Sequence, residues 1–230
     1  MPELFSLLSL LMLGFVLGLE HALDADHVAA VSAIASETKS VKKSSILGIF
    51  WGLGHTTTLF IAGIIVLIFK IVIPKNLALS FELLVGIMLI ALGLGVLWKA
   101  AKSKIHLHIH EHDGAGHVHF HSHALSESHS HSHAHKSFIV GAVHGLAGSA
   151  ALMLLVLSTA DSLFSGLLYI LVFGLGSIIA MLTISTIIGL PFRLTSNFGK
   201  INGAIKLIAG FASIILGVSI IYGILPILFV

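Results

Sequence analysis

Cysteine is absent from this chain of 230 residues. Disulfide frameworks, thiol relays and metal sites with thiolate ligands are therefore excluded. Charge is also scarce, because Asp, Glu, Lys and Arg make up only 10% of the residues, whereas soluble domains carry roughly a quarter. A soluble protein of this length could not wet its surface with so few charges. Hydrophobic residues make up 57% of the sequence, which favours an integral membrane protein with lipid as its solvent.

Apolar stretches long enough to cross a bilayer recur along the chain. A helix needs about 20 apolar residues to span roughly 30 Å of hydrocarbon. Six stretches meet this length, and Lys, Pro, Asn and Ser gather between them. The predicted spans are 4–35, 46–69, 79–98, 138–157, 163–190 and 204–230. The sequence therefore predicts an all-α integral membrane protein with six transmembrane helices.

The basic residues predict how the chain is oriented. Ten of the 12 lysine and arginine residues fall in the three connections on one side of the membrane or beside them. Only Lys70 and Lys75 fall on the other side. Because short cytoplasmic loops are rich in Lys and Arg, we expect both termini to lie outside and the long connection 99–137 to lie in the cytoplasm.

The first predicted span is too long for one upright helix. As a helix its 32 residues would extend about 48 Å at 1.5 Å per residue. Either the helix is strongly tilted, or its first dozen residues form a separate segment hinged near Gly14 or Gly18.

The two halves of the sequence resemble each other. Glycines in the first, second and third spans recur in the fourth, fifth and sixth spans at offsets of 123, 122 and 124 residues; the pairs are Gly18 with Gly141, Gly52 with Gly174, and Gly86 with Gly210. An odd number of spans per copy inserts the second copy upside down, as in many secondary transporters. We expect two inverted three-helix repeats, 1–98 and 138–230, joined by the His-rich cytoplasmic loop 99–137.

Ionisable residues crowd one stretch of the first span: Glu20, His21, Asp24, Asp26 and His27. Such groups are costly inside a bilayer, so they mark function by default. On a straight helix four of them share an arc of about 120°, and Asp26 points elsewhere. Imidazole suits borderline divalent cations such as nickel, cobalt, copper and zinc, and carboxylate adds charge neutralisation. Asp26 is then suited to orienting a histidine.

Two further intramembrane histidines extend this candidate site. His55 follows Gly52-Leu-Gly54 in the second span and precedes three threonines. His144 in the fourth span occupies the repeat position of His21. A lone histidine inside a membrane is often only a hydrogen-bond partner between helices. We therefore take His21, Asp24, Asp26, His27 and His55 as the predicted metal ligands, and His144, Glu20 and Glu82 as additional candidates.

At these residues the sequence resembles the nickel/cobalt transporter family. His21-Ala-Leu-Asp24-Ala-Asp26-His27 is similar to the family signature, and Phe50-Trp-Gly-Leu-Gly-His55-Thr56-Thr57 is similar to its second motif. Within the family the chain looks most like the short six-span branch, which includes urease-accessory nickel permeases and His-loop nickel/cobalt efflux proteins. The resemblance implies metal transport and assigns metal handling to the matching histidines and aspartates.

The connection between the third and fourth spans is a low-complexity tract in which every second residue is often histidine. We expect it to be disordered and to bind several metal ions weakly. A flexible spacer or a pH-sensing tract are the alternatives. Its histidines are His106, His108, His110, His112, His117, His119, His121, His123, His129, His131, His133 and His135.

The sequence thus predicts a secondary transporter, not an enzyme, that moves Ni²⁺ or Co²⁺ across the cytoplasmic membrane, with Zn²⁺ as a further candidate cargo. The chain has no Gly-Lys-Ser/Thr phosphate loop, so it does not hydrolyse ATP by itself. An intramembrane zinc enzyme is one alternative, although the His-Glu-x-x-His spacing is missing. A metal-sensing accessory subunit is another. Transport direction and oligomeric state stay open.

The expected partners follow from this reading. They are the metal ion, the lipid bilayer and a cytoplasmic metallochaperone as a candidate, without nucleic acid and without a prosthetic group.

Overall fold

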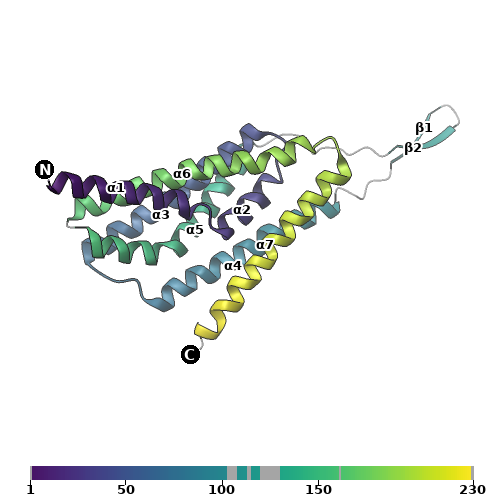
Figure 1. Ribbon diagram of the computed structural model, residues 1–230. Coiled ribbons are helices and arrows are strands. Elements are labelled where there is room, and N and C mark those ends of the chain that lie inside the picture. Colours follow the sequence, from purple (N-terminus) through teal and green to yellow (C-terminus); the bar gives the residue numbers. More distant parts are fainter. Residues whose placement is uncertain (1, 103–107, 113–114, 120–129, 161, 229–230) are drawn as a thin grey trace.

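The structure is a computed structural model in which residues 2–102, 108–112, 115–119, 130–160 and 162–228 are described. Helices make up most of this part of the chain (Figure 1). In chain order the elements are α1 (Pro2–His21), α2 (Ala25–Ala35), α3 (Val41–Phe69), α4 (Lys75–Lys102), β1 (His108–His112), β2 (Ala115–His119), α5 (Ser130–Thr159), α6 (Leu163–Leu194) and α7 (Gly199–Leu228).

Four of these helices, α3, α4, α6 and α7, are long and apolar enough to cross a membrane. The pair formed by α1 and α2 counts as a fifth span when its two pieces are taken together. The prediction of an α-helical membrane protein is therefore confirmed. The remaining expected span, 138–157, lies within α5, and its role as a span stays a prediction.

The first predicted span is broken, but not where the glycines suggested. α1 ends at His21, and α2 begins at Ala25 after a bend of 55°. The chain between them turns through two short-range bonds, Leu23 N–H to Glu20 O and Asp24 N–H to His21 O. The expected hinge near Gly14 or Gly18 is wrong, because both glycines lie within the continuous helix α1. The break instead falls inside the cluster of ionisable residues.

Helix α3 is central to the packing. It packs against α5 and α6, α1 packs against α6, and α4 pairs with α7. The short helix α2 touches α4, α6 and α7. Figure 1 shows the pair of α4 and α7 leaning away from the other helices towards the end where the C-terminus lies. The end of the molecule where α2 meets these two helices is thus the more closely packed end.

That closely packed end carries most of the positive charge, and we call it the basic end. It consists of the α2–α3 connection, the last turns of α4 and α6 and the first turns of α5 and α7. Its described basic residues are Lys39, Lys42, Lys43, Lys99, Lys102, Lys136, Arg193, Lys200 and Lys206. Lys70, Lys75 and both ends of the chain lie at the opposite end (Figure 1). Which end faces the cytoplasm stays a prediction.

The histidine-rich tract is more regular than expected. β1 and β2 pair antiparallel, with His108 opposite His119 and His110 opposite His117. The expectation of disorder is wrong here, because Ile and Val alternate with histidine on either side of Asp113-Gly114, a dipeptide typical of two-residue hairpin turns. His131, His133 and His135 belong to α5. The remaining tract histidines, at positions 106, 121, 123 and 129, lie outside the described residues.

Candidate metal centre

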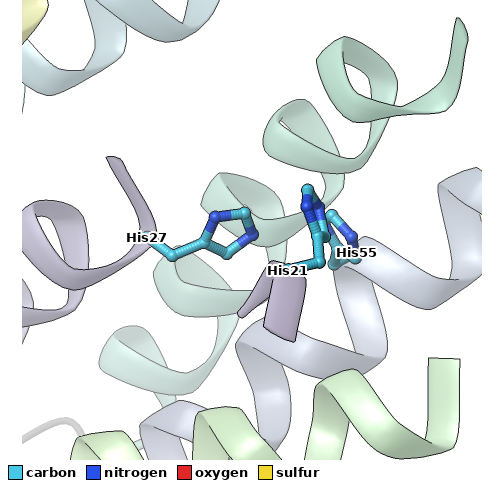
Figure 2. Close-up of side chains that lie close together, drawn as sticks. All are labelled: His21, His27 and His55. Carbon is cyan, nitrogen blue, oxygen red and sulfur yellow. The ribbon is translucent and has the colours of Figure 1, made fainter. Parts of the chain in front are cut away.

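Three histidines from three helices converge in the interior (Figure 2). His21 ends α1, His27 lies in the first turn of α2, and His55 lies midway along α3. Their ring centroids are 4.7 Å apart for His21 and His27, 5.2 Å for His21 and His55, and 5.3 Å for His27 and His55. One nitrogen of each ring lies within 4.8 Å of the other two. The break after His21 brings two histidines six residues apart to the same point.

A second group shares His27 with the first. It contains Asp26, His27 and His144 of α5, whose ligand atoms also lie within 4.8 Å of one another. The Asp26 carboxylate accepts a hydrogen bond from His27 Nδ1 at 3.2 Å and from His144 Nε2 at 2.9 Å. The rings of His27 and His144 are 4.0 Å apart. Together the residues form a buried His/Asp metal-binding cluster around His27 and His144, and we call His21, His27, His55 and His144 the histidine cluster.

These hydrogen bonds decide which nitrogens are available to a metal ion. Asp26 accepts from His27 Nδ1, so the lone pair of that ring stays on Nε2. Asp24 likewise pairs with His21 Nδ1 at 2.9 Å. A carboxylate that holds one imidazole nitrogen fixes the tautomer and raises the basicity of the other nitrogen. Both aspartates are therefore suited to preparing a histidine for metal binding.

Several ring nitrogens in the cluster are buried without a partner. Both nitrogens of His55 and the Nδ1 of His144 have no hydrogen-bond partner among the described residues. His27, His55 and His144 are at most 2% exposed. A buried polar atom left unpaired costs about 1–3 kcal/mol. A divalent cation that accepts the lone pair of His55 or His144 would remove part of that cost, so the residues fit a metal ion.

The site has a buried side and an exposed side. His27 and His144 are enclosed, whereas the side chains of His21 and Asp24 are 23% and 55% exposed. These two residues flank the bend between α1 and α2. The cluster is therefore least enclosed at the bend.

Only some of the predicted site residues lie together. His21, His27 and His55 form one group, and Asp26 joins His27 to His144. The expectation that Asp26 points elsewhere is wrong, because α2 starts a new helical phase after the break. Asp24 lies at the exposed edge against His21. Glu20 and Glu82 are exposed and belong to neither group.

Two aromatic side chains around the cluster were not predicted as part of the site. The Trp51 ring lies 5.6 Å from that of His144 and 6.2 Å from that of His27. Phe173 lies 5.6 Å from His21. Trp51 stands one helical turn before His55, inside the second quoted motif, which is the signal that could have identified it.

The chain is similar to known nickel-transport proteins. A family model described as high-affinity nickel-transport protein, NicO, matches residues 7–145, a stretch that includes all four histidines of the cluster. The urease accessory protein UreH of Bacillus sp. (strain TB-90) is 41% identical over 216 residues, which are 94% of this chain and 92% of that protein. No solved structure matches the chain. The matched family consists of transporters rather than enzymes, and the chain belongs to this NicO family of nickel-transport proteins.

Proposed function

We propose that the protein is a secondary transporter that carries Ni²⁺, Co²⁺ or both through the cytoplasmic membrane by way of the histidine cluster. The observation that carries this proposal is the convergence of imidazoles from α1, α2 and α3, with both nitrogens of the buried His55 ring left unpaired among the described residues. In this mechanism His21, His27 and His55 bind the ion. Asp26 and His144 hold His27 in place, and Asp24 holds His21.

The height of the cluster in the bundle supports transport. His55 is the midpoint of α3, and His144 is the midpoint of α5. At 1.5 Å per residue each lies about 21 Å from either end of its helix. Secondary transporters commonly bind their substrate near the bilayer midplane, where helices are discontinuous. The bend between α1 and α2 is such a discontinuity, and the negative end of the α1 dipole favours a cation there.

The proposed transporter consists of two inverted repeats, as the sequence predicts. Close backbone contacts support this arrangement because they occur in reciprocal pairs. Gly18 packs on the carbonyl group of Phe173, and Gly141 packs on that of Trp51. The repeat offsets carry Gly18 onto Gly141 and Trp51 onto Phe173, so they exchange the two contacts. Such an exchange is what a two-fold relation between the halves requires.

The same exchange relates α4 and α7. Gly86 packs on the carbonyl group of Gly217, and Gly93 packs on that of Gly210. The offset of 124 residues carries Gly86 onto Gly210 and Gly93 onto Gly217. Each contact thus becomes the other. Two halves related in this way can exchange conformations, and the exchange would expose the cluster to each side of the membrane in turn.

The histidine-rich segment takes a separate role in this proposal. With the basic end in the cytoplasm, the hairpin of β1 and β2 lies beside the cytoplasmic mouth. Its histidines hold metal ions loosely and raise or lower the local metal concentration. A string of histidines binds many metals, so the selective site is the buried cluster.

Metal flux in liposomes tests the proposal. The purified protein is reconstituted, and uptake and release of nickel, cobalt and zinc are followed in both directions. We expect nickel flux that depends on the protein alone, with cobalt as the second cargo. Metal binding by the intact protein without flux of any of the three ions would overturn the proposal and favour a sensing or accessory subunit.

A further inference from the structure

A buried carboxylate at the basic end joins three parts of the bundle. Glu37 lies in the connection between α2 and α3, and its side chain is only 8% exposed. Its Oε2 lies 2.8 Å from Lys99 Nζ in the last turn of α4. Its Oε1 lies 3.4 Å from Lys136 Nζ in the early part of α5. We call Glu37, Lys99 and Lys136 the ion clamp.

The carboxylate of the clamp is buried, whereas the side chains of Lys99 and Lys136 are 60% and 42% exposed. Burial alone would raise the pKa of Glu37, but the two ammonium groups hold that pKa below its ordinary value. Exposed pairs contribute little to stability because water screens both partners. A buried carboxylate that loses its partners instead leaves an uncompensated charge, which is strongly destabilising. The closed arrangement of these three segments therefore depends on the clamp.

The clamp lies beyond a layer of tightly packed residues that covers the histidine cluster. Each helix from the cluster to the basic end passes through this layer: α2 between His27 and Ser36, α3 between His55 and Ser44, and α5 between His144 and Lys136. The layer contains Val31, Ile34, Leu47, Trp51 and Val140, none more than 7% exposed.

A small cavity interrupts this layer. Its volume is about 10 Å³, and it is lined by residues that include Trp51, Ser44, Ser137 and Ser185. That is room for roughly one water molecule. Trp51 Nε1 and Ser185 Oγ are buried there without a hydrogen-bond partner in the described part of the chain. Polar atoms along an otherwise closed layer are what a route for a hydrated ion needs when the helices separate.

We propose that the ion clamp is the lock that keeps the histidine cluster closed towards the basic end, and that it opens in each transport cycle. The role of the clamp as a lock rests on the proposed transport function, whereas its ion pairs do not depend on that function. Separating α4 or α5 from the α2–α3 connection breaks one of the two ion pairs. The layer around Trp51 and Leu47 then parts at the cavity.

The repeat positions that match the two lysines of the clamp carry no lysine. Under the repeat offsets Lys99 corresponds to Gly223, and Lys136 corresponds to Leu13. Neither residue carries a charge. The two closed states therefore differ in stability. The state closed at the basic end has two ion pairs, and the state closed at the opposite end cannot form them at the matching positions. The clamp biases the resting transporter towards the state with the basic end closed.

Thiol labelling tests the lock directly, because the chain has no cysteine of its own. Ser44 lines the cavity and is 1% exposed, so Ser44→Cys is the reporter. A membrane-impermeant maleimide is applied to vesicles whose accessible side is the basic end. With the clamp intact we expect slow labelling. Adding Glu37→Gln should speed it by about tenfold, the effect of a shift of about 1.4 kcal/mol between closed and open states.

Lys102→Gln provides the matched control. It removes a lysine one turn beyond Lys99 on the same helix, and its ammonium group lies over the Trp98 ring. We expect no change in labelling. The double variant Lys99→Gln/Lys136→Gln removes both lysines of the clamp and should reproduce the effect of Glu37→Gln. It tests the clamp if Glu37→Gln does not fold.

Unchanged reactivity of Ser44→Cys in well-folded Glu37→Gln and in the double lysine variant would overturn the proposal. Equal acceleration by Lys102→Gln would do so as well. Labelling requires no metal, so the two proposals can fail separately. A protein without nickel flux whose reporter still responds to Glu37→Gln would refute transport but not the lock.

Discussion

Helices α1 and α2 on one side and α5 on the other are counterparts in the proposed repeat, and they differ where the metal chemistry lies. The first pair bends by 55° between His21 and Ala25. α5 runs unbroken from Ser130 to Thr159. At the positions that match Asp24, Asp26 and His27, it carries Ala147, Ser149 and Ala150. The half that carries the ligands is thus the half whose helix is broken.

The difference teaches why a break is needed. In a continuous helix His21 and His27 would lie about 9 Å apart along the axis, too far to share one ion at bond lengths near 2.1 Å. The bend folds them to a centroid distance of 4.7 Å. α5 contributes one histidine to the cluster, His144, and a single histidine requires no bend. Removing the ligands and carboxylates that only the α1–α2 pair carries tests this difference from α5.

The largest effect is expected for His27, because it belongs to both groups of the cluster. His27→Ala should abolish measurable nickel flux, with a loss of more than about 100-fold, since removing a ligand exceeds the roughly 10- to 100-fold cost of removing its hydrogen-bond partner. His135→Ala, an exposed histidine of α5, is the control and should leave flux unchanged. Flux from liposomes is the measurement, and normal flux with His27→Ala would refute the site.

The two aspartates should separate the buried side of the cluster from its exposed side. Asp26→Asn removes the carboxylate that accepts from both His27 and His144, so we expect nickel affinity to fall by about 10- to 100-fold. Asp24→Asn loses one contact at an exposed edge and should cost less than about tenfold. Isothermal titration of the purified variants with nickel measures both affinities. A larger loss for Asp24→Asn than for Asp26→Asn would contradict the role of Asp26 in fixing the His27 tautomer.

The glycine contacts test the repeat itself. A Cβ at Gly18 would press on the carbonyl of Phe173, and one at Gly141 on that of Trp51. Gly18→Ala and Gly141→Ala should therefore destabilise the protein by similar amounts, about 1–3 kcal/mol each. Gly203→Ala lies within α7 with nothing near the added carbon and should not destabilise the protein, because alanine favours a helix over glycine. Thermal unfolding in detergent compares the three, and a stable Gly141→Ala beside an unstable Gly18→Ala would weaken the two-fold relation.

Sequence reasoning reached the membrane class and placed His21, His27 and His55 together. It placed Asp26 away from the other ligands because a helical projection holds only while the helix continues, and the chain restarts its phase after His21. The histidine-orienting role expected for Asp26 matches its bonds to His27 and His144. His144 was signalled only by its repeat position. Glu37 carried no local signal at all, since its partners Lys99 and Lys136 lie far along the chain on two other helices. Contacts of that kind become visible only when the helix ends are placed in space.

The smallest effect is expected outside the helices, in the histidine-rich segment. Because α5 begins at Ser130 and carries Lys136 of the ion clamp, a deletion should end before that helix; removing 106–129 satisfies this. We expect nickel flux to persist, with an apparent affinity changed by only a few-fold, because weak sites near the mouth change local concentration rather than the buried cluster. A deletion extended to 106–136 should in addition increase labelling at Ser44→Cys, since it takes Lys136 from Glu37. Loss of flux in the shorter deletion would place the essential metal site in the histidine-rich segment. The difference between the broken α1–α2 pair and the unbroken α5 would then not explain metal binding.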